Sequence, residues 1–510
     1  MRAQKTSNRL GAGAPEPLLA PGALKASAKD AEGNAVRSGS WSHSLGHPWS
    51  HWQTHADALH GAAALRANRP ASEAAHNAAR LILLDTIGCM LAGREAPEVL
   101  AFEENFSALE SGPFTFPGGR RLSLNAAAQT GALAATWDEA CEGHAYAHGR
   151  PGVAAVAALL PLAVASERGL DATVDALALA YEVGARAGGW LRIKPGMHVD
   201  GVWPALGVAA GVARLIGLDA HGIARAIDIA ACQLPASVYL PVTQGKTARN
   251  TYLAHSASLG MQAAFSAQAA ISAPDDALAY YAANFSVATP DALPAPQEEL
   301  ILDAYIKPYA AVRHVHYGAE MAKSAREELG NGTASGLGAG GTAAPATGTG
   351  VINTSGITLI TLATYPEATI YCGNRAPQTP IQAQFSLSFG IAAMLRFGVL
   401  DSSVYRREKF EDPELRRLEA LVEISIDRAL ETQGKRGGSL LVSNGYKDIE
   451  RDVRAIPGDA SMPLSAEEVA AKFMRYSKAR VPHEKAFVFA NALLASEVDV
   501  KMRALWDLLF

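Results

Sequence analysis

The chain has 510 residues, and its 49% hydrophobic, 19% charged and 7% aromatic content is typical of a globular protein rather than a disordered or fibrous one. Its 45 Lys and Arg residues are outnumbered by 50 Asp and Glu residues, and the net charge of −5 argues against a general nucleic-acid-binding protein. Four cysteines without a Cys-x-x-Cys pair indicate neither a disulfide framework nor a cysteine zinc site, so we expect a cytoplasmic protein.

The N-terminal segment, residues 1–52, is rich in Gly, Ala, Pro and Ser and has no helical or strand periodicity. We predict a flexible arm there. The longest strongly apolar stretch, 153–165, contains Pro161 and falls well short of the roughly 20 residues that a helix needs to cross a bilayer. We therefore expect no membrane span.

Residues 53–300 have the apolar spacing of amphipathic helices, at steps of three and four residues. Gly93 ends a predicted helix over 74–91, and Pro151 begins another that runs to Glu167. Further helices are predicted over 171–188, 203–217, 221–233 and 250–271. Because these segments are rich in Ala and Gly, we expect closely spaced axes in a large all-α bundle.

Residues 301–460 differ from the helical region in composition and in the spacing of apolar residues, and they predict a smaller α+β domain. Within it, 329–352 is almost wholly Gly, Ala, Thr and Ser, which predicts a flexible insertion. Strands are predicted over 357–372, 421–427, 439–443 and 446–453, the last two joined at Asn444-Gly445, with a helix over 387–398. Residues 461–510 return to helix after Ser465 and Glu468, which have capping-box spacing. The predicted fold class is mainly α, a large helical bundle plus this smaller domain.

The first of four polar clusters contains Asp138, Glu142, His144 and His148, between two predicted helices. Acids and imidazoles in one connection can supply a proton acceptor and the group that orients it. His144 and His148 are spaced like two zinc ligands on a helix, but Ala145 stands where the HExxH motif has its glutamate. A zinc site and a plain hydrogen-bonded turn stay open as alternatives.

The second and third clusters each precede a predicted helix. His198 lies just before the helix at 203, where backbone N–H groups favour an anion such as a carboxylate. Lys246 and Arg249 lie before the helix at 250 and supply two cations, with a solvated pair as the alternative.

The fourth cluster, at the passage from the bundle to the α+β part, contains Lys307, Arg313, His314 and His316. Small-molecule sites are common between domains, and arginine can bind a carboxylate through two hydrogen bonds. The sequence contains no Walker loop, no Rossmann glycine fingerprint after a strand and no Gly-x-Ser-x-Gly elbow. We therefore predict neither a cofactor nor a metal.

With these clusters, the sequence resembles the MmgE/PrpD family of cofactor-independent enzymes, which includes 2-methylcitrate dehydratase, cis-aconitate decarboxylase and iminodisuccinate epimerase. The matching phrases occur in order along about four fifths of the chain. They are LLDTIGCMLAG (83–93), YEVGAR (181–186), HVDG (198–201) with LIGLD (215–219), Lys307-Pro-Tyr309 through His316, QFSLS (384–388), and PLSAEE (463–468) with Lys472-Phe473.

The resemblance implies roles position by position. A family aspartate falls on Asp138, a threonine on Glu142, the histidine of a His-Pro-Gly/Ser segment on His148, and the histidine of a His-Pro-Thr-Gly segment on His198. A family lysine aligns with Arg249, although Lys246 is the nearest lysine. Val312 stands where the decarboxylase has a histidine, and three neighbours match an Arg-His-x-His segment: Arg313, His314 and His316.

We predict an enzyme that moves a proton next to a carboxylate of a small di- or tricarboxylate, with dehydration by a hydro-lyase as the first expectation. His198, His148 and Asp138 are the predicted proton-exchanging residues. The predicted substrate-binding residues are Lys246, Arg249, Lys307, Arg313, His314, His316, Glu142 and His144. The resemblance further implies a bundle built from both chain ends, 53–300 and 461–510, a lid over 301–460, and a homodimer.

Other functions stay open at this point. A decarboxylase or an epimerase would act on the same substrate class, and a metal-dependent hydrolase would use His144 and His148. The departures from the family pattern at Glu142, Arg249 and Val312 suggest a catalytically silent carboxylate-binding or scaffold protein on the same fold.

Overall fold

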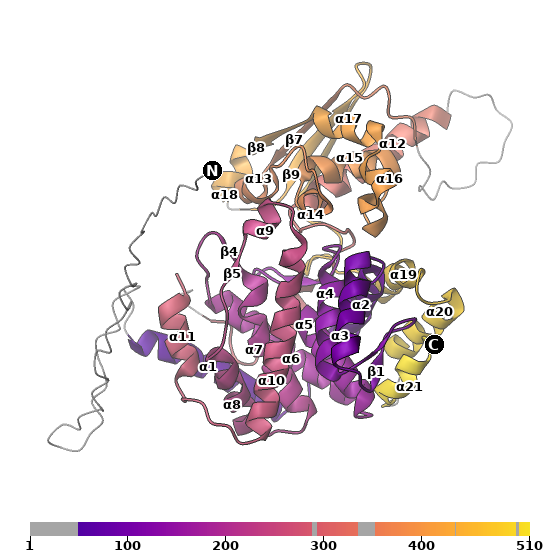
Figure 1. The fold of residues 1–510 in the computed structure, drawn as a ribbon. Coiled ribbons are helices and arrows are strands. Elements are labelled where there is room, and N and C mark those ends of the chain that lie inside the picture. Colours follow the sequence, from indigo (N-terminus) through magenta and orange to yellow (C-terminus); the bar gives the residue numbers. More distant parts are fainter. Residues whose placement is uncertain (1–48, 288–292, 335–351, 434, 496–498) are drawn as a thin grey trace, which may run out of the picture. The chain divides into compact units, whose positions relative to one another are not determined.

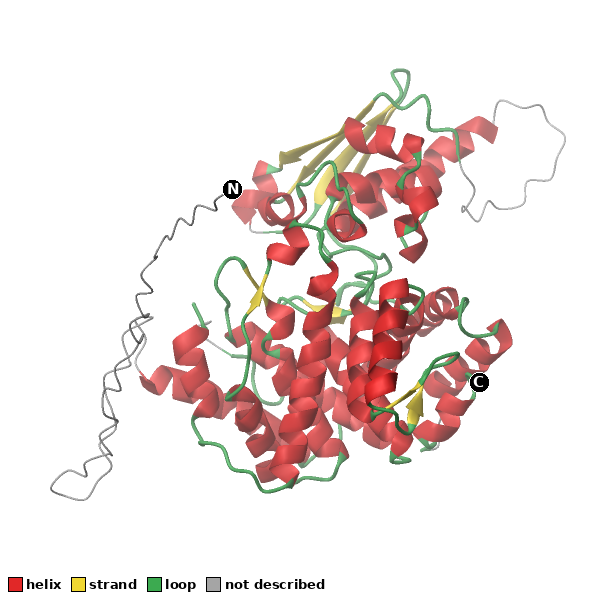
Figure 2. Cartoon of the chain, in the orientation of Figure 1, coloured by secondary structure: helices red, strands yellow, loops and turns green. Residues whose placement is uncertain are grey.

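The computed structural model describes residues 49–287, 293–334, 352–433, 435–495 and 499–510, and the mainly α fold class is confirmed (Figures 1 and 2). None of the helices in these ranges is both long and apolar enough to cross a membrane. Most of the predicted arm, and residues 335–351 of the predicted insertion, lie outside the described residues. Two boundaries differ from expectation, because α1 (Trp49–Ala67) begins inside the predicted arm and α12 (Val315–Ala334) extends into the predicted insertion.

The helical bundle is built from both ends of the described chain. Its helices are α1, α2 (Glu73–Gly93), α3 (Pro97–Leu109), α4 (Leu124–Thr136), α5 (Pro151–Ala165), α6 (Leu170–Trp190), α7 (Pro204–Leu215), α8 (Ala220–Ala231), α10 (Tyr252–Gln268), α11 (Ala277–Phe285), α19 (Ala466–Ser477), α20 (His483–Ala495) and α21 (Met502–Asp507). A short hairpin, β1 (Phe114–Thr115) and β2 (Arg121–Leu122), follows α3. Helix α5 is buried along almost its whole length and packs on α4, α6, α7 and α10. The C-terminal α19 and α20 pack on α2, and α21 packs on α5 (Figure 1).

Small side chains let the helix axes approach closely, as the Ala- and Gly-rich sequence predicted. A Cβ atom at Gly207 of α7 would lie 2.4 Å from the carbonyl oxygen of Ala180 on α6, which is far inside van der Waals contact. At Gly211, one turn later, it would lie 2.7 Å from the Ala180 Cβ atom. Larger residues would push α6 and α7 apart and move the connections at their ends.

The second part of the fold contains a four-stranded sheet (Figure 2). Its strand order is β10-β9-β7-β8. Its strands are β7 (Leu359–Thr364), β8 (Val422–Ile426), β9 (Gly438–Ser443) and β10 (Asp448–Val453), and its further helices are α13 (Pro366–Cys372), α14 (Pro380–Gln384), α15 (Leu387–Phe397), α16 (Arg407–Phe410), α17 (Pro413–Leu421) and α18 (Arg428–Gln433). Strand β7 runs parallel to β8 and antiparallel to β9, with Leu362 paired to Ile424 and Leu440. Helix α12 packs on β9 and β10, and α15 packs on α12 and β8.

Local sequence signals explain most of these elements. Gly445, at φ +81°, turns the predicted hairpin, and Ser465 and Glu468 form the predicted capping box of α19. The strand predicted over 357–372 is wrong beyond Thr364, because Pro366 occupies the first turn of α13, where its missing N–H costs nothing. The division into a bundle domain and a lid over 301–460 stays a prediction.

Candidate active site

Two short antiparallel ladders bring the four polar clusters of the sequence together in pairs. Strand β3 (Gly143–His144), between α4 and α5, pairs with β6 (Ala304–Tyr305), which precedes Lys307. Strand β4 (Met197–His198) pairs with β5 (Ser237–Val238), and the chain from β5 continues through α9 (Leu240–Thr243) to the short helix that carries Arg249. The first and fourth clusters are therefore neighbours, and so are the second and third.

A cavity of about 600 Å³ opens where these connections meet. Seven Lys and Arg side chains and three acidic ones line it: Arg150, Arg192, Lys194, Arg249, Lys307, Arg313 and Arg436, with Glu139, Asp200 and Glu367. Four histidines also line it: His144, His148, His198 and His314. This excess of cations, in a chain whose net charge is −5, makes the cavity a local site for anions.

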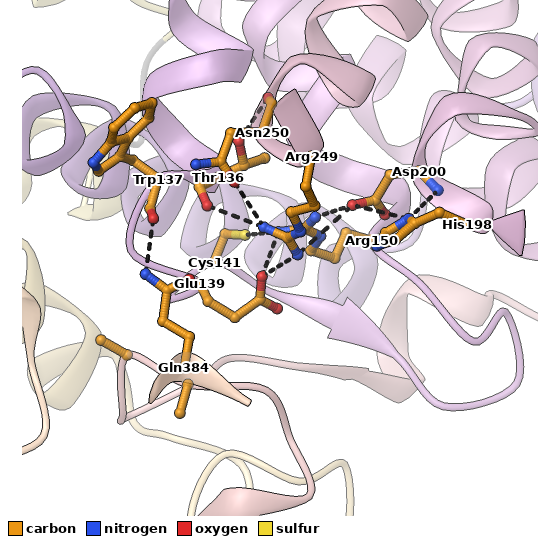
Figure 3. A network of polar contacts seen from close by, with 12 residues as sticks. Thr136, Trp137, Glu139, Cys141, Arg150, His198, Asp200, Arg249, Asn250 and Gln384 are labelled. Atoms are coloured by element: carbon orange, nitrogen blue, oxygen red, sulfur yellow. Dashed lines mark hydrogen bonds and ion pairs between the residues drawn. The ribbon is translucent and has the colours of Figure 1, made fainter. Parts of the chain in front are cut away.

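Glu139 is the acidic centre of a buried group of cations (Figure 3). Lys307 Nζ donates to Glu139 Oε1 at 2.6 Å, Arg150 Nη1 donates to Oε2 at 3.2 Å, and Arg249 donates to the same oxygen. Burial raises the pKa of Glu139, but Arg150, Arg249 and Lys307 outweigh burial and hold this pKa well below its usual range. The carboxylate is therefore charged at neutral pH and fixes three cations in place.

Asp200 supplies the second anion of this group. Arg150 donates to Asp200 Oδ2, and Arg249 Nη2 lies 3.9 Å from the same oxygen. We call these residues the Glu139 cluster: Glu139, Asp200, Arg150, Arg249 and Lys307. With three cations against two anions, the cluster keeps one positive charge in excess at the cavity wall.

His198 is held as a neutral imidazole in one orientation. Its Nδ1 accepts a hydrogen bond from the Asp200 backbone N–H at 3.2 Å, so the neutral ring carries its proton on Nε2. Tyr239 stacks on the ring, with centroids 5.7 Å apart, and Tyr252 meets it edge to face. Burial and then the nearby arginines, above all Arg249, hold the pKa of His198 well below its usual range. His198 therefore presents an Nε2–H donor.

His148 is the second imidazole of the helical side. Among the described residues its ring makes no hydrogen bond, and its backbone has a φ of +54°. Loss of hydration and then the charge of Arg192 lower the pKa of His148 to about 4. The ring is thus unprotonated at neutral pH and able to accept a proton.

Aromatic rings connect the two sides of the cavity. His314 Nδ1 lies 2.7 Å from the Tyr365 hydroxyl, and the His314 ring stacks on Tyr371 with centroids 5.8 Å apart. Tyr371 in turn meets Tyr239, the stacking partner of His198, edge to face at 6.0 Å. The chain of rings therefore joins a residue from the start of α9 to residues of α13.

Two arginines of the sheet side are each paired with an acid. Arg313 pairs with Asp459 and lies over the Tyr305 ring, and Arg436 pairs with Glu367 at 3.0 Å. Val312, where the family resemblance expects a histidine, also lines the cavity. The side chain at 312 is apolar and cannot itself transfer a proton.

Glu142 lies outside the cavity lining, unlike the substrate-binding position predicted for it. Its Oε1 accepts hydrogen bonds from the backbone N–H groups of Gly152 and Val153, at 2.8 and 3.1 Å, and Tyr181 donates to Oε2 at 3.0 Å. Burial raises the pKa of Glu142 to about 7. The carboxyl group caps the first turn of α5, a task that its spacing before Pro151 allows.

Three other predicted residues also lie outside the cavity lining. Asp138 is buried away from the cavity, and burial raises its pKa. His316 is buried in the first turn of α12, with Nε2 3.0 Å from the Ala311 carbonyl oxygen. Lys246 is exposed, whereas Arg249 is buried in the Glu139 cluster, so of these two cations it is Arg249 that reaches the cavity.

The two histidines considered as zinc ligands do not belong to a cluster of such ligands. His144 Nε2 lies 2.9 Å from the Leu300 carbonyl oxygen, and its Nδ1 accepts the Ala147 N–H. Across the described ranges, no three His, Cys, Asp or Glu side chains come together as a metal site requires.

Several cavity residues were missed from the sequence. Glu139, Arg150 and Asp200 are each within two residues of a predicted position or helix start, so their chain neighbourhood was a usable signal. Others have no such signal, because they come from separate segments and meet only in the fold: Arg192, Tyr239, Glu367, Tyr371 and Arg436.

Comparison with known families gives two matches that follow each other along the chain. The MmgE/PrpD N-terminal domain matches residues 60–297, and the MmgE/PrpD C-terminal domain matches residues 309–497. The cavity is lined from both matched regions. No individual curated protein matches the sequence.

Proposed function

Because this chain belongs to the MmgE/PrpD family, we propose that it is a lyase-type enzyme that dehydrates a small di- or tricarboxylate. The observation that carries the proposal is the meeting of two neutral imidazoles, His148 and His198, with an excess of cations in one cavity. A silent binding protein would need the cations but not both imidazoles.

The cations address the main difficulty of the reaction. Removing a proton from a carbon next to a carboxylate places more negative charge on a group that is already an anion. Cations fixed before the substrate arrives stabilise this charge without reorganising. Arg249 and Lys307, both tied to Glu139, are fixed in this way.

The two imidazoles suit different tasks. His148 has an unprotonated ring that can take the proton from carbon. His198 offers Nε2–H, which can donate a hydrogen bond to the oxygen on which charge develops. The proton taken by His148 then leaves with the departing hydroxide as water, so that a carbon–hydrogen and a carbon–oxygen bond break and a carbon–carbon double bond forms.

A panel of hydroxylated and unsaturated di- and tricarboxylates, incubated with the protein in deuterated water and followed by ¹H NMR, tests this function. We expect one acid to exchange its proton next to a carboxylate and to gain or lose water. Proton exchange with loss of carbon dioxide would indicate a decarboxylase instead of a dehydratase. Proton exchange with inversion at the carbon atom alone would indicate an epimerase. Binding of the acids, seen as a thermal shift, without any exchange would indicate the silent protein.

The homodimer and the cytoplasmic location remain proposals that rest on the resemblance and on the cysteine content. Light scattering on the purified chain measures the first. Fractionation of cells that produce the protein measures the second.

A further inference from the structure

Arg192 is positioned by hydrogen bonds of its backbone. It follows the end of α6 at Trp190, whose carbonyl accepts the Arg192 N–H at 3.0 Å, and the Ser286 hydroxyl oxygen accepts the same N–H at 3.0 Å. The Arg192 carbonyl accepts the Val287 N–H at 2.7 Å. Contacts to α6 and to the end of α11 therefore fix where the side chain starts.

The guanidinium of Arg192 differs from five other cations of the cavity, which are buried or partly buried. Arg150, Arg249, Lys307, Arg313 and Arg436 each contact a carboxylate. Arg192 lines the cavity and is partly buried, yet within the described ranges its side chain has neither a hydrogen bond nor an acidic partner.

This unpaired state carries a cost that a bound anion would remove. Burial lowers the pKa of Arg192, although nearby Tyr146 opposes the shift. A partly buried guanidinium without an acid loses hydration and gains no ion pair in return. Lys194, which also lines the cavity, is exposed and keeps its water.

We infer that Arg192 binds one carboxylate of the substrate at the His148 end of the cavity and selects acids with at least two carboxylates. The inference rests on the proposed function, because it assigns the second carboxylate of that substrate. One carboxylate lies beside the cations of the Glu139 cluster during proton transfer, and the other forms a bidentate pair with Arg192.

Binding at Arg192 also changes the neighbouring base. The charged and titratable groups that act on His148 are Arg192, Glu367, Arg436 and His144. A carboxylate paired with Arg192 offsets the strongest of these charges, so the pKa of His148 rises from about 4 when the substrate binds. The site thus strengthens its base only when a polycarboxylate is in place.

The test compares Arg192→Gln and Arg192→Lys with Arg69→Gln, which removes the same charge from an exposed position outside the cavity lining. Isothermal titration measures the dissociation constants of succinate, with two carboxylates, and of butyrate, with one. We expect Arg192→Gln to weaken succinate binding by about 10- to 100-fold and butyrate binding less than about 2-fold. Arg192→Lys should fall between, because lysine keeps the charge but not the paired donors.

A second measurement needs no ligand: a pH titration followed by ¹⁵N NMR gives the pKa of His148. In the free protein Arg192→Gln should raise the pKa of His148, whereas Arg192→Lys and Arg69→Gln should leave it near the wild-type value. If wild type and Arg192→Gln bind succinate equally, or if His148 titrates identically in both, this inference is wrong while the proposed function stands. If wild type binds no polycarboxylate at all, the proposed function fails, and this inference fails with it.

Discussion

The Glu139 cluster and the Arg192 end of the cavity satisfy their charges in different ways. In the cluster, each of three buried cations contacts an acid of the protein itself. At the other end, Arg192 has no acidic partner among the described residues, and His148 beside it is unprotonated. The difference indicates that one end is fixed before a ligand arrives, while the other is completed by the ligand.

Removing the carboxylate of Glu139 should have the largest effect on the fixed end. Glu139→Gln leaves Arg150 and Arg249 with Asp200, and it leaves Lys307 without an acidic partner among the described residues. Breaking a buried pair in this way costs about 3–5 kcal/mol. We expect the free energy of unfolding, measured by urea denaturation, to fall by that amount. The matched control is Glu367→Gln, because Glu367 and Arg436 keep 39% and 32% of their side chains exposed and should contribute less than about 1 kcal/mol. If the free energy of unfolding fell equally in the two variants, burial would not explain how much each ion pair contributes to stability.

The free energy of unfolding should depend on pH because of Glu139. The native pKa of Glu139 is depressed, so its stabilising contribution is present above the unfolded pKa of 4.5 and is lost as the pH falls through the lower native pKa. Urea denaturation between pH 3 and pH 7 should therefore show a loss of stability below about pH 4.5 that Glu139→Gln does not share. A variant that retains the full acid dependence contradicts this assignment.

The two imidazole roles predict a graded loss at His198. His198→Gln keeps an N–H donor near the position of Nε2, whereas His198→Leu removes it. We expect His198→Leu to lower kcat by about 10²–10³-fold and His198→Gln to lower it at least about 10-fold less. The measurement is steady-state turnover of the acid found in the NMR panel. Equal losses in the two variants would contradict the role of His198 as a hydrogen-bond donor.

Glu142 is a second buried glutamate of the same connection, but among the described residues it forms no ion pair with a cation. Its native pKa is about 7, above the unfolded value of 4.5, so its contribution is fully present below pH 4.5 and is lost as the pH rises through 7. Glu142→Gln should remove this loss, which is on the order of 2 kcal/mol between pH 5 and pH 8. If the free energy of unfolding, measured by urea denaturation, changed with pH in the same way for the variant and wild type across this range, the assignment would be contradicted.

The smallest effect is expected at Lys246. Because this side chain is exposed and outside the cavity lining, Lys246→Ala should change stability by less than about 0.5 kcal/mol and turnover by less than about 2-fold. Arg249→Ala, three residues later, should abolish measurable turnover. If both variants lost turnover equally, Lys246 would also act on the substrate, and if neither lost turnover, the role assigned to Arg249 would be wrong.

The fold was largely predictable because its signals are local. Asn444-Gly445, the capping box at Ser465 and the helix start at Pro151 act through the conformations of a few neighbouring residues. The strand predicted through Cys372 failed for the same kind of reason, since alternation of apolar residues continued while Pro366 had already begun a helix.

The site was predictable only in part, because its geometry depends on contacts between distant segments. The pairing of β3 with β6 joins residues about 160 positions apart, and nothing in either segment alone specifies it. Asp138 and Glu139 are adjacent acids, yet only Glu139 faces the cavity, so residue type could not choose between them. Arg192 has no acidic partner among the described residues, and this property depends on its surroundings in space and leaves no pattern in the sequence.

The binding of a polycarboxylate between Arg192 and the Glu139 cluster can be observed in a structure of the protein with the unreactive tricarboxylate tricarballylate bound. We expect one carboxylate within hydrogen-bonding distance of both terminal guanidinium nitrogens of Arg192, and another within hydrogen-bonding distance of His198 Nε2 and Lys307. A ligand that leaves Arg192 without a partner, or that binds outside the cavity lined by His148 and His198, would contradict this expectation.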